Sequence, residues 1–468
     1  MKLKYFFIAL VAMVACFSEA FAQQVITVSN AEELKQALKE AGAAPQARQA
    51  AQGSRATLPL LSIELSEDYD DASVLPINSY LELASEVKLL LNGHVVNGDV
   101  TLAAGNLSIV DATGTGAWIG CITVNSGATL AAGSGSIIAG ESGVAVINKG
   151  TLSTDGGAVI GKITNTGSME GVATYNTALV ANTTVAQAAL NAAIDGQGIQ
   201  VAGDIEGDLT AVQKPNTKIT IDGADNNTLK GAITIDGKSS AYATTGVTIK
   251  NLNFDATAIT TEASINLGVK GNNNTRYTNH VTVENCTFTD NDYSAAAVKS
   301  YTGGDKNLVI TGCTATDMHS LVQLANVEEG LIIESCTANT KNGINLGSSA
   351  GVQITKNTIN VKGYGVRIGA SSGGESGTIT MTENTLTTDN TEGDPVIVLR
   401  GTAPDQVDLK MSENSVSGNG HISGTTANTK ISAEANYWSG KENPVVAEGS
   451  TPVVVNSYYT DAARTTLE

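Results

Sequence analysis

A row of polar and basic residues in the second half of the chain could bind an anionic polymer. Its members are Lys299, Gln323, Asn345, Arg367 and Arg400. Each falls in or beside an outward position of a short apolar stretch that recurs along the chain, so their side chains would follow one another along one surface. Guanidinium and ammonium groups suit the anionic groups of a glycan. The simpler interpretation, which we favour, is a solvated outer face.

Three cysteines occupy equivalent places in consecutive repeats, at Cys286, Cys313 and Cys336. In-register neighbours in a parallel sheet lie about 4.8 Å apart, beyond the usual Cβ separation of about 3.5–4.5 Å in a disulfide. We therefore predict buried free thiols that pack as small hydrophobic side chains, even though export permits disulfides. A thiolate metal site is the alternative, but no His lies at the same position of the repeat.

The same column continues as asparagine, at Asn357, Asn384, Asn414 and Asn436. Stacked amides can hydrogen-bond from one repeat to the next. The pattern predicts a structural ladder. The alternative, a polar ligand site, is weaker because these side chains should point inward.

The repeat around this column predicts the fold. Two apolar residues one apart are followed by a two-residue break, the column residue and one more apolar residue, as in Val281, Val283, Cys286 and Phe288. Alternation with a period of two indicates strand, and the step of three indicates a corner. The column residues fall at 252, 286, 313, 336, 357, 384, 414 and 436, and repeats of this length indicate a solenoid. We predict an all-β fold, a right-handed parallel β-helix, with loops at its corners.

Two short amphipathic helices are expected to cap the solenoid. Residues 28–41 and 183–193 each place apolar side chains on one helical face after a polar cap, and such a helix can cover the unpaired edge of a β-helix. We predict two β-helical domains, 23–175 and 176–468. Residues 43–60 have no strand period, and we predict an extended or mobile insertion there.

The repeat in the first domain is less regular, and its corner loops are shorter. Inward apolar residues are expected at Leu107, Leu130, Leu152 and Met169, each preceded by Gly at a corner.

Residues 1–22 have the organisation of an export signal. Lys2 and Lys4 precede an apolar core that is too short to span a bilayer, and Ala20-Phe21-Ala22 offers a cleavage site. A lipoprotein signal with an anchor at Cys16 is the alternative. No later stretch resembles a transmembrane helix, so we expect an exported protein at the cell surface or outside the cell.

The net charge of the chain limits the classes of partner that it can bind. The formal net charge is −19, and 16% of residues are charged. Such a surface repels phosphate backbones, so nucleic acid is not expected as a partner. It could attract divalent cations, so calcium is kept as an option although no cofactor is predicted.

The coils, the corner loops and the ending 435–440 with Pro444 resemble the right-handed β-helix proteins of the pectin-lyase-like superfamily. The resemblance covers residues 246–459 well and the first domain loosely. It implies either polysaccharide lyases and glycosidases or adhesins without catalytic activity. The superfamily's lyases use a basic residue near acid-held calcium, and its hydrolases use clustered aspartates with a His. The second domain has no adjacent aspartate pair, and its histidines, at 280, 319 and 421, are scattered.

No catalytic or metal-binding residue is therefore predicted. Asp290 and Asp292 lack a convincing calcium ligand set and indicate a turn instead. We favour a non-enzymatic exported structural protein, either a surface-layer-type component or an adhesin, which would self-associate or bind a surface glycan. The alternative is a polysaccharide-active enzyme or a glycan-binding module, and the sequence leaves catalysis open.

Overall fold

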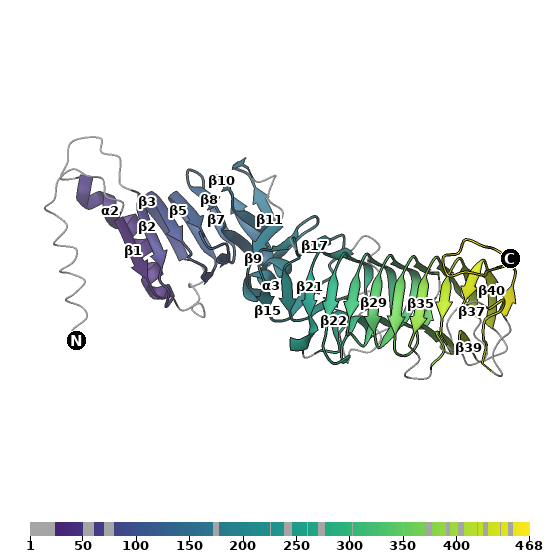
Figure 1. Cartoon of the computed structure of the whole chain (residues 1–468). Helices are drawn as coiled ribbons and strands as arrows, with labels where there is room; N and C mark the ends of the chain where they lie inside the picture. The colour runs from purple at the N-terminus through teal and green to yellow at the C-terminus, as the bar shows by residue number, and fades with distance from the viewer. Residues whose placement is uncertain are drawn as a thin grey trace.

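A computed structural model describes the protein over residues 24–49, 60–69, 79–171, 177–224, 226–237, 246–259, 261–269, 277–301, 303–349, 351–369, 377–389, 394–400, 407–418, 420–424, 429–439, 441–447 and 453–468. The expected export signal, including Cys16, lies outside these residues, so it stays a prediction. The strands described below pair with one another in parallel, and the chain forms an elongated solenoid (Figure 1). The prediction of an all-β parallel solenoid is confirmed.

The first part of the solenoid is one 12-stranded sheet with a helix at its start. It contains α2 (Ala31–Gln49), β1 (Gln24–Val28), β2 (Leu61–Leu65), β3 (Ser79–Leu90), β4 (Val95–Asn97), β5 (Val100–Val110), β6 (Ala117–Ile119), β7 (Ile122–Val124), β8 (Thr129–Gly133), β9 (Ile137–Asn148), β10 (Thr151–Asp155), β11 (Ala158–Asn165) and β12 (Ser168–Glu170).

Helix α2 begins with a capping box. The Asn30 side chain accepts a hydrogen bond from the Glu33 backbone N–H at 3.0 Å, and the Glu33 carboxylate accepts one from the Ser29 N–H at 2.8 Å. The helix runs on to Gln49. The prediction of an extended insertion from residue 43 is therefore wrong for 43–49, where Ala, Gln and Arg are good helix formers.

The expected inward column of the first part is present. Leu107 pairs with Leu130, Leu130 with Leu152, and Leu152 with Met169. The three leucines are buried, but Met169 is 40% exposed. It belongs to β12, which pairs with β10 alone among the described strands, so no described rung covers it on the other side.

The second part of the solenoid has two long sheets, of 20 and 11 strands. The 20-stranded sheet contains β13 (Thr177–Val180), β14 (Gly198–Val201), β16 (Leu209–Val212), β17 (Lys218–Asp222), β19 (Ile233–Asp236), β20 (Gly246–Lys250), β22 (Ala263–Leu267), β23 (Asn279–Glu284), β25 (Ala296–Ser300), β26 (Gly303–Thr311), β28 (Ser320–Glu334), β30 (Asn342–Ser349), β31 (Val352–Thr355), β33 (Val366–Gly369), β34 (Gly377–Thr382), β36 (Ile397–Arg400), β37 (Val407–Ser412), β39 (Ile422–Gly424), β40 (Thr429–Glu434) and β42 (Val453–Val455). The 11-stranded sheet contains β15 (Ile205–Glu206), β18 (Thr228–Lys230), β21 (Asn253–Asp255), β24 (Thr287–Thr289), β27 (Thr314–Thr316), β29 (Thr337–Thr340), β32 (Thr358–Val361), β35 (Thr385–Thr388), β38 (Ser415–Ser417), β41 (Asn436–Trp438) and β43 (Tyr458–Tyr459).

The two parts meet at helix α3 (Thr183–Ala192). The Asn182 side chain caps this helix by accepting from the Val185 N–H at 2.9 Å, and it donates to the Thr115 carbonyl of the first part at 2.8 Å. Gln197 accepts from the Gly161 N–H at 2.9 Å. The helix therefore packs between the two parts. Strand pairing changes between β12 and β13, while a domain boundary at residue 175 stays a prediction.

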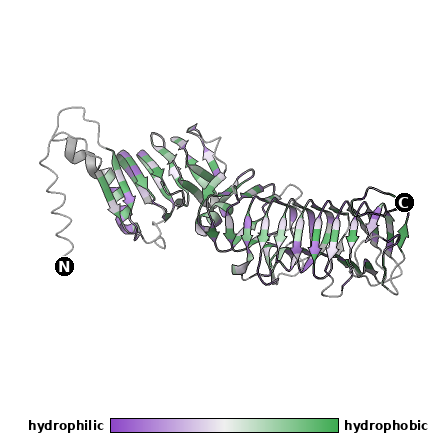
Figure 2. Cartoon of the chain, in the orientation of Figure 1, coloured by the Kyte–Doolittle hydropathy of each residue, from purple (hydrophilic) through white to green (hydrophobic). Residues whose placement is uncertain are grey.

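Eight successive coils of the second part turn one corner with a left-handed residue. The residue immediately before each column position has φ between 51° and 62°, at Asn251, Asn285, Gly312, Ser335, Lys356, Glu383, Glu413 and Ala435. One residue in this conformation redirects the chain, so the apolar residues on both sides of the corner face the same core. Hydrophobic and hydrophilic residues accordingly alternate along the strands (Figure 2).

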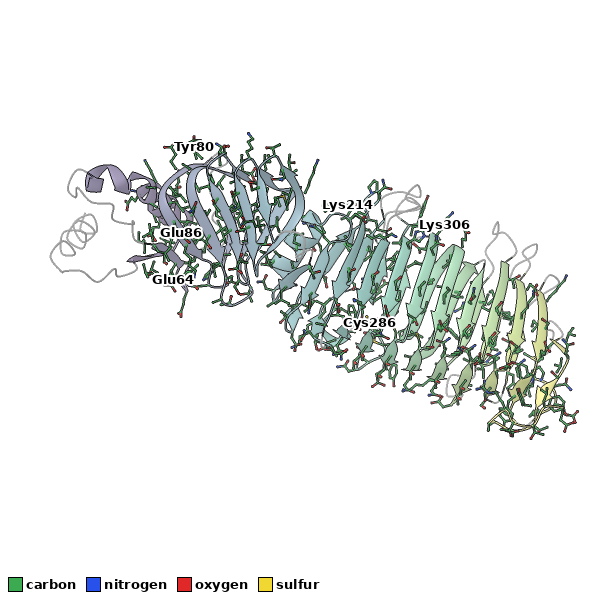
Figure 3. All side chains as sticks on the ribbon, turned by 90° about the horizontal axis from the view of Figure 1, so that it is seen from above. Glu64, Tyr80, Glu86, Lys214, Cys286 and Lys306 are labelled. Atoms are coloured by element: carbon green, nitrogen blue, oxygen red, sulfur yellow. The ribbon has the colours of Figure 1, made fainter. Side chains whose placement is uncertain are left out.

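The cysteine column is buried and its thiols are free, as predicted. The position of Cys286 along the rod is labelled in Figure 3. Each Sγ donates to a carbonyl of the preceding coil: Cys286 to Ile249 at 3.7 Å, Cys313 to Val283 at 3.6 Å and Cys336 to Ile310 at 3.6 Å. Hydrogen bonding to Cys286, together with burial, raises the pKa of Cys313 to about 12. Cys313 is therefore an un-ionised core group.

The asparagine ladder is also confirmed. Each Nδ2 donates to the equivalent carbonyl of the preceding coil, and each Oδ1 accepts from the backbone N–H of the preceding column residue. Adjacent amides are joined directly as well, at 2.8–2.9 Å. Cysteine and asparagine thus donate to the equivalent carbonyl of the preceding coil, because both have a short side chain that ends in a donor.

Candidate functional site

The predicted polar row is largely one register position of the 20-stranded sheet. Lys299 pairs with Gln323, Gln323 with Asn345, and Asn345 with Arg367. Arg400 pairs with Gly369 instead, and Val398 takes the row position beside Arg367. The structure therefore brings four of the five residues together and sets Arg400 two residues further along its strand.

The positive charges of this row already have partners. The Lys299 ammonium forms an ion pair with the Glu262 carboxylate and lies 5.4 Å from the centre of the Tyr301 ring. The Arg367 guanidinium lies 5.7 Å from the centre of the Tyr364 ring. Since Glu262 neutralises Lys299, the row offers an anionic glycan less charge than the sequence indicates.

A cavity of about 260 Å³ lies at the start of this row. Asn266, which pairs with Lys299, lines it together with Glu262 and Tyr301. The Asn266 Nδ2 donates to the Ala263 carbonyl at 3.0 Å, while its buried Oδ1 has no hydrogen-bond partner. The cavity therefore contains one unused acceptor next to an ion pair.

A second pocket, of about 270 Å³, lies where loops leave the 11-stranded sheet. We call it the Tyr293 pocket. Its charged and aromatic lining comes from Tyr293, Asp317, Lys362 and Asp389. The Tyr293 hydroxyl donates to the Asp317 carboxylate at 2.8 Å, and the Lys362 ammonium lies 3.9 Å from the centre of the Tyr293 ring. A ring, a cation and carboxylates from separate coils thus converge.

The backbone of this pocket is held in an uncommon conformation. Tyr293 has φ 60° and Asp317 has φ 56°, a region that bulky residues rarely occupy. The Tyr293 N–H donates to the Asp317 carbonyl at 3.1 Å. Backbone and side chain therefore both tie Tyr293 to Asp317, which keeps the two residues together at the wall of the pocket.

Electrostatics keep Lys362 charged. Its pKa is raised by hydrogen bonding to Tyr293, and also by the nearby charges of Asp389 and Asp317. The pocket therefore presents an ammonium donor beside carboxylate acceptors at neutral pH.

Sequence reasoning missed this pocket although it left a signal. Asp317, Lys362 and Asp389 each directly follow a strand of the 11-stranded sheet, namely β27, β32 and β35. Counted from the register-equivalent threonines Thr314, Thr358 and Thr385, Lys362 and Asp389 fall in one row, and Asp317 lies one position before it. Tyr293 gave no such signal, because it comes from a loop four residues beyond the end of β24.

The Asp290 loop is a turn, as expected. The Asp290 carboxylate accepts from the backbone N–H groups of Asn291, Ser294 and Ala295, at 2.8–3.0 Å. In the described ranges, no group of three or more His, Cys, Asp or Glu side chains could hold a metal ion. The expectation that no cofactor is needed, with calcium as an option, stays untested.

The histidines of the second part remain apart, and the most buried of them has a packing role. His421 is fully buried, and its Nδ1 accepts from the Val445 N–H at 2.8 Å. Its ring lies 5.7 Å from that of Trp438. No helix in the described part of the chain is both long and apolar enough to cross a membrane.

The chain is similar to known proteins at the level of this fold. Residues 231–436 match the family model described as the right handed beta helix region. No curated protein matches the chain. The second part is therefore a right-handed parallel β-helix, consistent with the pectin-lyase-like superfamily that the sequence resembles.

Proposed function

We propose that the protein is an exported, non-enzymatic structural protein of the cell surface that acts as an adhesin-type rod. The supporting observation is the unbroken column from Cys286 to Asn436, in which every side chain hydrogen-bonds to the preceding coil. A rod whose buried polar groups are paired from coil to coil is stiff and offers a protease few exposed strand edges. The Tyr293 pocket lies on the side of this rod, where a ligand in solution can reach it.

The test of this proposal is location together with architecture. Antibody labelling of intact cells in the native host should detect the full chain at the surface. Negative-stain electron microscopy of the purified chain should show rods. Regular, calcium-dependent arrays of the purified chain would instead favour a surface-layer component. A chain retained inside the cell would contradict both versions.

A polysaccharide-active enzyme is the second candidate function. It is favoured by Asp317 and Asp389, two carboxylates that line one pocket next to a cation, since glycosidases use carboxylate pairs. Incubation with neutral and uronic-acid polysaccharides, followed by detection of new reducing ends and unsaturated products, tests it. Turnover that Asp317→Asn or Asp389→Asn abolishes would establish an enzyme, and turnover lost on Arg367→Ala or Lys299→Ala would place catalysis on the polar row. Absence of turnover across both classes would favour the structural protein.

A further inference from the structure

The Tyr293 pocket opens beside a surface of uniform chemistry. Five successive strands of the 11-stranded sheet, β24, β27, β29, β32 and β35, each direct two side chains outward. All of these side chains are Thr or Asn: Thr287, Thr289, Thr314, Thr316, Thr337, Asn339, Thr358, Asn360, Thr385 and Thr387. We call this surface the Thr/Asn face. It carries no formal charge in a chain whose net charge is −19.

The face and the pocket are continuous. Asn339, Asn360 and Thr387 belong to the second outward row of the face and also line the pocket. The Asn360 Nδ2 donates to the Asn339 Oδ1 at 3.1 Å, which orients both amides. Each amide has two donors and an acceptor with two lone pairs, so both retain capacity for a ligand. A polymer could therefore lie on the face while one of its units enters the pocket.

The size and lining of the pocket suit one sugar ring. Its volume of about 270 Å³ is just below the roughly 300–1,000 Å³ of sites for drug-sized ligands. Asp317 offers acceptors, Lys362 offers donors, and Tyr293 offers an aromatic surface against which the carbon–hydrogen groups of a sugar can pack. Because Tyr293 and Lys362 already hold each other, little side-chain conformational freedom is lost on binding.

The spacing of the face suits a polymer rather than a single small molecule. Neighbouring strands repeat about every 4.8 Å along the axis, comparable to the length of one pyranose unit in an extended glycan. Threonine hydroxyls can donate and accept at each repeat, as sugar hydroxyls can. The absence of charge on the face and the two carboxylates of the pocket favour an uncharged chain over an anionic one.

From this geometry we infer that the Thr/Asn face and the Tyr293 pocket together bind an uncharged glycan, with its chain along the axis of the rod and one sugar ring in the pocket. This inference rests on the proposed adhesin-type function and names the class of its ligand. The site lies on a different sheet from the polar row of Lys299, Gln323, Asn345 and Arg367, so variants can separate the two surfaces.

Binding by the purified full chain tests the inference. The probes are the neutral polysaccharides mannan, laminarin, galactan and xyloglucan, with polygalacturonate and alginate as anionic counterparts, followed by affinity electrophoresis and calorimetry. At least one neutral probe should bind, with little dependence on salt. Lys362→Met and Thr358→Lys should each weaken that binding at least tenfold. Thr358 is exposed, so Thr358→Lys should keep the fold. A loss of binding in this variant therefore tests the site even if Lys362→Met misfolds.

The matched control is Lys299→Met, which removes one lysine from the polar row and should leave neutral-glycan binding unchanged. The inference is overturned if no neutral probe binds, or if binding survives both Lys362→Met and Thr358→Lys. It is also overturned if the chain self-associates in sedimentation experiments through a surface that Thr358→Lys disrupts while no glycan binds. The assay uses purified protein, so an intracellular location would refute the proposed function without altering this result.

Discussion

The side-chain amide of Asn357 donates a hydrogen bond to the amide oxygen of Asn384 in the next coil, 2.9 Å away. The same oxygen accepts from the Asn357 backbone N–H at 3.0 Å, and Asn384 in turn donates to the Ile354 carbonyl at 2.7 Å. The Asn384 amide also donates to the Asn414 Oδ1 at 2.9 Å, so one buried side chain satisfies donors and acceptors of two other coils. Its removal leaves backbone groups unpaired in the core, where each costs about 1–3 kcal/mol.

Asn384→Leu should therefore destabilise the protein by at least about 2 kcal/mol. The measurement is the shift in the midpoint of urea unfolding, followed by circular dichroism. Asn360→Ala is the matched control, because Asn360 is exposed on the outer face and should change stability by less than about 0.5 kcal/mol. Equal midpoints for the two variants would mean that the ladder does not stabilise the fold.

The stacked thiols should be inert in the native protein. Because hydrogen bonding and burial raise the pKa of Cys313 to about 12 and raise that of Cys336 as well, these groups remain protonated at pH 8. A thiol reagent should label Cys286, Cys313 and Cys336 only after denaturation, as peptide mass spectrometry can show. Rapid labelling of the folded chain, or a disulfide among the three, would contradict the predicted packing.

Cysteine and asparagine should be exchangeable within the column. Cys336→Asn places an amide next to Asn357, where it can donate to the Ile310 carbonyl that the thiol now contacts. We expect a change in stability below about 1.5 kcal/mol, as for substitutions that conserve side-chain volume. Cys336→Ala loses that contact and leaves a cavity, so it should be the less stable of the two in the same urea assay.

The burial of His421 makes stability depend on pH. Burial, and then the charge of Lys441, lowers the pKa of His421 to about 4, against about 6.5 in an unfolded chain. Between these values the unfolded state binds more protons, so stability falls as the pH decreases. The contribution of His421 to the free energy of unfolding is fully present above about pH 6.5 and is lost as the pH falls toward 4. It is at most about 3 kcal/mol.

Thermal unfolding from pH 7 to pH 4 measures this effect, with His421→Gln as the comparison. Gln retains an acceptor for the Val445 N–H but does not titrate. The difference in unfolding temperature between the unchanged protein and His421→Gln should shrink steadily as the pH falls below 6.5. A difference that stays constant over this range would show that His421 is not responsible.

The ion pair of the polar row should contribute little to stability. The Glu262 side chain is 45% exposed and that of Lys299 is 16% exposed, so water still reaches the pair, and such pairs are worth about 0–1 kcal/mol. Lys299→Gln should therefore shift the unfolding midpoint only slightly, and high salt should remove even that difference. A large loss of stability would indicate that the row is part of the scaffold.

The core of the second part was predictable because its geometry is local. A left-handed residue directly before the column makes the step of three that the sequence displays, so Cys286 and Asn384 could be placed inward from spacing alone. Arg400 was misplaced relative to Arg367 because strand register beyond a long loop depends on the path of that loop, which periodicity does not encode.

The Tyr293 pocket is a second case in which sequence periodicity does not encode the positions of side chains. Its charged residues come from equivalent strand ends, but Tyr293 reaches them only because the backbone at residues 293 and 317 turns with positive φ. Such turns follow from tertiary contacts, here the hydrogen bonds between Tyr293 and Asp317. The helical extension of α2 to Gln49 was missed because the lack of a strand period in a segment does not by itself indicate an extended chain.

The left-handed corner also defines where this protein tolerates change. In seven successive coils two residues separate the strands on either side of this corner, as between Glu284 and Thr287 or between Thr382 and Thr385. In these seven coils, the variation in coil length is therefore confined to the other corners. For protein engineering, those corners are the places to insert foreign loops, while the two-residue corner must keep its length because it sets the register of every later coil.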